Sequence, residues 1–193
     1  MKHSLLSCVS AIGLAIAGPV WAVETVTPTP MATDNMPAPA TFVYDGSSPI
    51  PMPVITWGAD MTTLHANGNT PITAASSIFD QAGVNLELYR KDTFRDQVRA
   101  FRSGETPFLR GTVDMVTAAS EALCDVPETC PEIMYTHSRS AGGDILIANN
   151  ANGVTDVRSL RGKTIGLQLD GPHMNLLVET LAIGGLTIDD VTI

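Results

Sequence analysis

The chain has few basic residues, few cysteines and no long apolar run outside its N-terminus. It holds 11 Lys and Arg against 20 Asp and Glu, for a formal net charge of −9 over 193 residues. This deficit excludes a nucleic-acid binder, which needs a basic surface for phosphates. The downstream apolar runs are too short to span a bilayer. A hydrophobic fraction of 44% excludes global disorder, and the length suits one domain or one lobe plus part of another.

The sequence also lacks the motifs of the common catalytic sites. There is no Gly-x-Ser-x-Gly, no phosphate-binding loop and no Ser-His-Asp order, and His65, His137 and His173 stand singly. Catalysis needs a positioned acid and base, or a nucleophile with its base. We therefore expect no catalytic residue, no bound metal and no cofactor.

The N-terminus has the pattern of a secretory signal peptide over residues 1–22. A short basic start precedes an apolar run over residues 5–17, and Pro19 and the small residue Ala22 suit a signal-peptidase site. This apolar run is shorter than a comfortable transmembrane helix. We expect a periplasmic protein; the alternative is that the segment stays as a membrane anchor.

Cysteine usage agrees with export. Removal of residues 1–22 takes away Cys8 and leaves Cys124 and Cys130. An even count in an oxidising compartment favours a disulfide, which would close the polar, turn-like loop between them. The alternative is metal binding, although no histidine or second cysteine pair lies at ligand spacing nearby.

The mature chain predicts a leader followed by an α/β domain. Residues 23–52 are rich in proline and hold no Lys or Arg, which is typical of an extended, mobile segment, so folded structure should begin near Pro53. Beyond it, strand-like and helix-like patterns alternate, which favours βαβ units and a mostly parallel sheet. The patterns predict strands at 54–58, 84–89, 113–116, 133–137, 144–148, 164–169 and 188–193, and helices at 70–83, 93–103, 154–162 and 172–184.

Ligands of such folds bind beyond the carboxyl ends of the strands. This rule selects four loops, at residues 60–70, 117–121, 138–143 and 169–175. On the second predicted helix, Arg95, Arg99 and Arg102 are interpreted as a solvated surface. Trp57 on the first strand is interpreted as a core residue, with a stacking platform as the alternative.

Several segments, in order, resemble the periplasmic solute-binding proteins of ABC importers, in the nitrate/sulfonate/taurine-type branch. These are Leu160-Arg161-Gly162-Lys163 after a short helix, Gln168-Leu169-Asp170-Gly171-Pro172-His173, the run from Gly185 to Ile193, and Gly111-Thr112-Val113-Asp114-Met115 after a helix that contains Phe94-Arg95-Asp96. The resemblance covers about residues 53–193.

The resemblance implies a type II periplasmic binding fold, with two α/β lobes that close around a solute. The first lobe would span 53–150 and the second 151–193, with the hinge crossing near 148–152. Family members continue through the rest of the second lobe, so we expect a C-terminally truncated chain. The implied partners are a small-molecule solute and an ABC permease with its ATPase; we expect a monomer.

The turn at Gly171-Pro172 is the strongest local candidate for ligand contact. Proline in the first helical turn leaves the next backbone N–H groups, including those of His173 and Met174, free to face an acceptor. The alternative is that these groups bind water or a cap. The full set of expected ligand contacts is Asp60, Met61, Thr62, Thr117, Ser120, Glu121, Gly142, Gln168, Gly171, Pro172, His173 and Met174.

The charges near these loops are mostly negative. Asp60, Glu121, Asp144 and Asp170 lie near strand ends, and Arg139 is the only cation that the sequence places there. Because an anion needs charge-assisted donors, this favours a neutral polar, heterocyclic or cationic solute. The alternative is that each carboxylate is simply solvated. Nearby methionines suit either gap filling or an adaptable ligand wall.

We therefore expect a non-enzymatic solute receptor. Two alternatives stay open: an enzyme on the same scaffold, such as a pyrimidine-precursor synthase relative or a periplasmic dehydratase, and a binding module associated with a sensor. An adjacent permease gene would favour uptake, and an adjacent histidine kinase gene would favour sensing.

Overall fold

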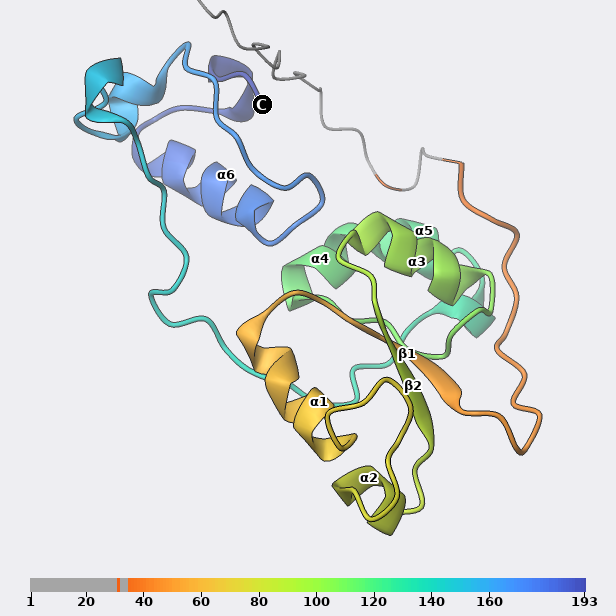
Figure 1. Ribbon diagram of the computed structural model, residues 1–193. Helices are drawn as coiled ribbons and strands as arrows, with labels where there is room; N and C mark the ends of the chain where they lie inside the picture. Colours follow the sequence, from red (N-terminus) through yellow and green to blue (C-terminus); the bar gives the residue numbers. More distant parts are fainter. Residues whose placement is uncertain (1–30, 32–34) are drawn as a thin grey trace, which may run out of the picture.

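The structure is a computed structural model that describes residue 31 and residues 35–193 (Figure 1). The predicted signal peptide lies outside these residues. The fold is mixed α/β, as expected. Its main elements are β1 (Ile50–Val54), α1 (Met61–Ala66), α2 (Ile78–Gln81), β2 (Leu86–Arg90), α3 (Phe94–Arg102), α4 (Val113–Ala118), α5 (Ser120–Leu123), the 3-10 helix η5 (Val157–Leu160), α6 (His173–Ile183) and the 3-10 helix η6 (Ile188–Asp190).

The described residues form two units with separate cores. The first unit (residue 31 and residues 35–130) packs Phe94, Val98 and Leu123 in one cluster and the inner faces of β1 and β2 in another. The second unit (residues 150–193) packs the buried face of α6 on the turns around it. A connector over residues 131–149, which has no helix or strand, joins them (Figure 1). Each fully buried leucine contributes roughly 1.5–3 kcal/mol by leaving water.

The sheet of the described region is a parallel pair, β1 and β2, in the register Ile50 to Leu86 through Val54 to Arg90. Ile50 donates its backbone N–H to Asn85 O at 2.9 Å. The alternate positions of β1 therefore face away from β2, and both are proline: Pro51 and Pro53. Since proline has no N–H, this edge cannot offer those donors to a further strand. The two strands overlap the expected ones, with β1 shifted toward the N-terminus.

Other expected strands are absent from the described part of the chain. Residues 113–116 lie in helix α4, where Thr112 Oγ1 accepts from Met115 N at 3.4 Å. Residues 133–137 and 144–148 lie in the connector and form no strand pairing. The last two predicted strands meet only at a parallel bridge between Thr164 and Thr192. These predictions were wrong because strand propensity becomes a strand only where a neighbour completes the hydrogen bonds.

Helices α3 and α6 lie where the sequence predicts them. The predicted helix over 70–83 is reduced to α2, which begins after Ser77, whose hydroxyl accepts from Asp80 N at 3.2 Å. The preceding residues run along β2 instead, since Leu88 N donates to Pro71 O at 2.7 Å. The polar stretch 60–70, expected as a loop, contains α1.

Contacts of the first unit begin before Pro53. Arg102 Nε donates to Pro37 O at 2.8 Å, and Ala40 N donates to Arg102 O at 2.8 Å. The segment then passes so close to Gly104 that a Cβ there would lie 2.8 Å from Thr41 O. Gly104 also has a φ of +74°, which residues with a Cβ rarely adopt. Both the close contact and the backbone conformation therefore favour glycine at this position.

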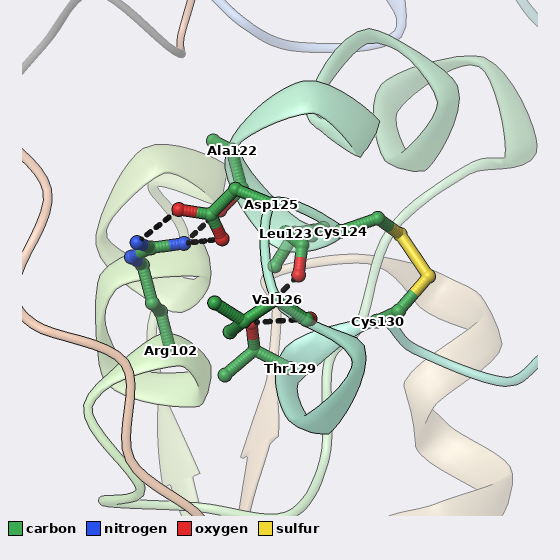
Figure 2. Close-up of a disulfide and its surroundings, with 8 residues drawn as sticks. All are labelled: Arg102, Ala122, Leu123, Cys124, Asp125, Val126, Thr129 and Cys130. Carbon is green, nitrogen blue, oxygen red and sulfur yellow. Dashed lines mark hydrogen bonds and ion pairs between the residues drawn. A yellow bond between two sulfur atoms is a disulfide. The ribbon is translucent and has the colours of Figure 1, made fainter.

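Cys124 and Cys130 form a disulfide, which confirms the predicted pairing (Figure 2). Arg102 binds the same loop from the other side, with Nη1 and Nη2 each 2.5 Å from an oxygen of Asp125. This contact lowers the pKa of Asp125 and raises that of Arg102, because each partner favours the charged form of the other. Inside the loop, Thr129 Oγ1 donates to Leu123 O at 2.7 Å. The loop is therefore fixed to α3 as well as closed on itself.

Two kinds of feature are absent from the described residues. No group of His, Cys, Asp and Glu side chains there is arranged to hold a metal ion. No helix in that part of the chain combines the length and apolar character that crossing a membrane requires.

Candidate functional site

The carboxyl ends of β1 and β2 are joined by a side-chain contact. Thr56, just after β1, donates from its backbone N to Asp92 Oδ1 at 2.6 Å and from Oγ1 to Asp92 Oδ2 at 3.1 Å. These hydrogen bonds lower the pKa of Asp92, because they favour its ionised form. The strand ends, where ligands of parallel sheets bind, are thereby held in one place.

Asp60 anchors the loop after β1 from inside the protein. Its side chain is only 2% exposed, and it accepts from Ile55 N at 2.8 Å and from Arg110 Nε at 2.8 Å. The guanidinium carbon of Arg110 lies 4.9 Å from the ring centre of Trp57, and Trp57 is 39% exposed. Asp60 therefore serves structure, whereas Trp57 is a partly exposed platform and not a core residue. Arg110 Nη2 is buried and has no hydrogen-bond partner among the described residues.

His137 attaches the connector to this anchor. Its Nε2 lies 2.8 Å from Thr62 Oγ1, and its Nδ1 lies 3.4 Å from Asp60 Oδ1. The histidine side chain is 15% exposed, while residues 138–148 beyond it are exposed. Thr62, an expected ligand contact, thus binds the connector, and its neighbour Met61 is 59% exposed.

The turn of the second unit contacts the same end of the sheet. Asp170 accepts from Arg95 Nε at 2.7 Å and from Arg95 Nη2 at 3.2 Å, and Gln168 Nε2 donates to Asp92 O at 3.1 Å. Asp170 has a φ of +57°, a left-handed conformation that aspartate tolerates better than most residues. These contacts place the turn before α6 against the start of α3.

The interpretation of the α3 arginines as a solvated surface was wrong for two of them. The Arg95 side chain is 15% exposed because it pairs with Asp170, and that of Arg102 is 8% exposed because it pairs with Asp125. Arg95 and Arg110 also correct the expectation that Arg139 is the only cation near the strand ends. Each of the two is balanced by an aspartate.

A solvent-open hollow of about 290 Å³ lies between α4 and the start of α6. This volume is close to the lower limit of the roughly 300–1,000 Å³ that small-molecule sites occupy. The wall of the hollow brings expected contacts Gly171 and Met174 to the first unit. The lining residues are Met31, Asp114, Met115, Ala118, Asp170, Gly171, Met174, Asn175 and Val178.

A smaller hollow, of about 220 Å³, lies on the other side of the same turn, between the connector and α6. It contains two further expected contacts, Gln168 and His173, together with the connector residues Ile145 and Leu146. His173 Nε2 lies 4.0 Å from Asp144 Oδ1. The rest of its wall is mostly aliphatic.

The remaining expected contacts are less central. Thr117, Ser120 and Glu121 are exposed on α4 and α5, and Gly142 is exposed in the connector. Pro172 occupies the N-cap position of α6. The proposal of free N–H groups at this helix start is wrong for Met174, whose N–H donates to Gly171 O at 3.2 Å.

Sequence reasoning missed Arg95, Arg110, His137 and Asp114 as residues of this region. Arg95 could have been predicted. It follows the predicted strand 84–89 by a few residues, and ligands of parallel sheets bind near the carboxyl ends of strands. Arg110 and His137 could not have been predicted in this way. Both lie in coil segments far from Asp60 in the sequence, and only folding brings them to it.

Comparison with known protein families, with curated proteins and with solved structures gives no match.

Proposed function

We propose that this chain is the substrate-binding component of a periplasmic ABC importer and that it captures a small solute between its two units. The observation that carries the proposal is the hollow between α4 of the first unit and the start of α6 in the second. Its volume of about 290 Å³ suits only a compact molecule, and both units contribute to its wall. In this proposal the units are lobes of a type II periplasmic binding fold.

The contacts between the units support a clamp. Arg95 with Asp170, and Gln168 with the Asp92 carbonyl, are polar links beside the hollow. The connector over residues 131–149 supplies a hinge, because it has neither helix nor strand and touches the first unit through His137. A solute closes such a clamp only by binding the closed arrangement better than the open one.

The enzyme alternative is weaker because one hydroxyl has two competing acceptors. Thr62, His137 and Asp60 have the order of a nucleophile, base and orienting acid. However, Ala59 O lies 2.9 Å from Thr62 Oγ1, so this carbonyl competes with His137 Nε2 for the single hydroxyl proton. A catalytic base needs that proton directed at it.

A calorimetric screen tests the proposal. The full chain is titrated with a panel of amines, amides, heterocycles and sulfonates, and a solute that binds is then tested on two variants. Ala118→Trp fills the hollow and should abolish binding. Ala182→Trp places the same ring on an exposed face of α6 outside the hollow, and should bind as the parent does. If Ala118→Trp binds the solute as tightly as the parent does, the solute binds outside this hollow and the proposal is overturned.

A further inference from the structure

The charge in the hollow between α4 and α6 is not balanced. Its charged lining residues are Asp114 and Asp170. Asp170 is neutralised by Arg95, with Nε 2.7 Å from Oδ2. Asp114 is partly buried, and its carboxylate has no ion pair or hydrogen bond within the described part of the chain. Among the described residues, the lining contains no Lys, Arg or His. The described part of the wall therefore presents one uncompensated negative charge.

The rest of the wall is soft and apolar. Met31, Met115 and Met174 contribute three thioethers, from the segment before β1, from α4 and from α6, and Ala118 and Val178 add aliphatic surface. Methionine side chains are polarisable and adapt to irregular or aromatic shapes. Asn175 supplies an amide that can orient a polar substituent.

We infer that the hollow binds a small organic cation with an apolar body, whose ammonium or amidinium group pairs with Asp114 while its body packs against the methionines. This inference rests on the proposed function and names the class of its solute. A carboxylate that is partly removed from water is stabilised by a cation and repels an anion. The paired Asp170 contributes no further charge, so a monocation balances the site.

Asp114 also lies in the first turn of α4, where an acidic residue is favoured by the helix whether or not a ligand binds. The two roles differ in one measurable respect. A purely structural Asp114 leaves solute binding indifferent to the charge of the solute, whereas a ligand-binding Asp114 makes affinity depend on it.

The test uses the full chain with ¹³C-labelled methionine methyl groups and three probes of one size: benzylammonium, benzyl alcohol and benzoate. Met115→Leu and Met174→Leu assign the two signals. We expect benzylammonium to shift both methyls and to bind about tenfold more tightly than benzyl alcohol, the difference that one charge-assisted contact supplies. Benzoate should bind most weakly.

Three variants isolate the carboxylate. Asp114→Asn should remove the preference for benzylammonium and leave benzyl alcohol unchanged, Asp114→Glu should keep the preference, and Asp189→Asn, which removes an exposed carboxylate in η6, should behave as the parent does. Benzoate bound as tightly as benzylammonium at these methyls would overturn the cation inference but leave solute capture intact. Failure of all three probes to shift the two methyls would also overturn it, and the broader calorimetric screen decides separately whether any solute binds.

Discussion

The two units of this protein are stabilised by different kinds of interior. Within the described residues, every buried polar or charged side chain belongs to the first unit: Asp60, Thr63, Asn67, Gln97, Arg102, Thr106 and Thr129. The second unit has a purely aliphatic buried cluster, made of Leu160, Ile165, Leu177, Leu181 and Leu186. The first interior depends on directional contacts that leave costly unpaired groups when broken, whereas the second depends on shape and area.

The largest expected effect tests whether the units are independent. Leu181→Ala removes a fully buried side chain from the second unit and should cost roughly 2–5 kcal/mol of its unfolding free energy. Because the cores are separate, the melting of α6 by circular dichroism should move to lower temperature, while the transition of Trp57 fluorescence in the first unit stays in place. A joint shift of both transitions would show that the two units unfold together.

Arg102→Met tests the polar interior. The methionine retains much of the side-chain volume but leaves Asp125, the Ala122 carbonyl and the Pro37 carbonyl without their donor. We expect a loss of roughly 2–3 kcal/mol, measured by urea unfolding with Trp57 fluorescence. Arg158→Met, at an exposed position of η5, is the matched control and should stay within about 0.5 kcal/mol. Equal losses of unfolding free energy in Arg102→Met and Arg158→Met would show that the first unit does not depend on its buried polar contacts.

Acid should weaken the first unit through its depressed carboxyl groups. Arg102 holds the pKa of Asp125, and the Thr56 hydrogen bonds hold the pKa of Asp92, below the ordinary value of 3.8. Their stabilisation is therefore complete above the unfolded pKa and is lost as pH falls from about 4 through the folded values. Urea midpoints between pH 5 and pH 2 measure this loss. The slope should decrease in Asp125→Asn, and an unchanged slope would contradict the assignment.

The smallest effect concerns the contact between the units. Asp170→Asn keeps a residue that tolerates the positive φ but removes the charge that pairs with Arg95. We expect each unit to retain its stability, a loss of about 1 kcal/mol in the contact between them, and a larger radius of gyration by small-angle X-ray scattering. Asp189→Asn should leave the radius unchanged. A compact Asp170→Asn variant would mean that other contacts hold the units together.

The success of sequence reasoning follows the same division between interiors. Helix α6 could be predicted because the Gly171-Pro172 turn precedes it and Gly184-Gly185 ends it, and both are local signals. Helix α3 could be located from Thr93 and Gly104, but the burial of two of its arginines could not be predicted. Arg95 is buried by Asp170, which lies 75 residues further along the chain. No periodicity carries that information.

The candidate site was predicted in part for a similar reason. The strand-end rule and the resemblance led to Gly171 and Met174, which do line the hollow between α4 and α6. The rule also selected Asp60, which the structure buries under Arg110 and the Ile55 N–H. Which acidic residue is neutralised and which is not depends on partners brought together by folding. The sequence therefore placed Asp114 in a family-like motif but did not include it among the expected ligand contacts.

The alternation of Pro51 and Pro53 along β1 has a consequence for behaviour at high protein concentration. An open sheet margin normally invites intermolecular strand addition, the first step toward amyloid-like assembly. Here two successive outward donors are missing, and the outward Pro51 carbonyl already accepts from Thr106 Oγ1 at 2.6 Å. This edge of the small sheet, where Pro53 is also fully buried, is therefore poorly suited to pairing with a strand of another copy.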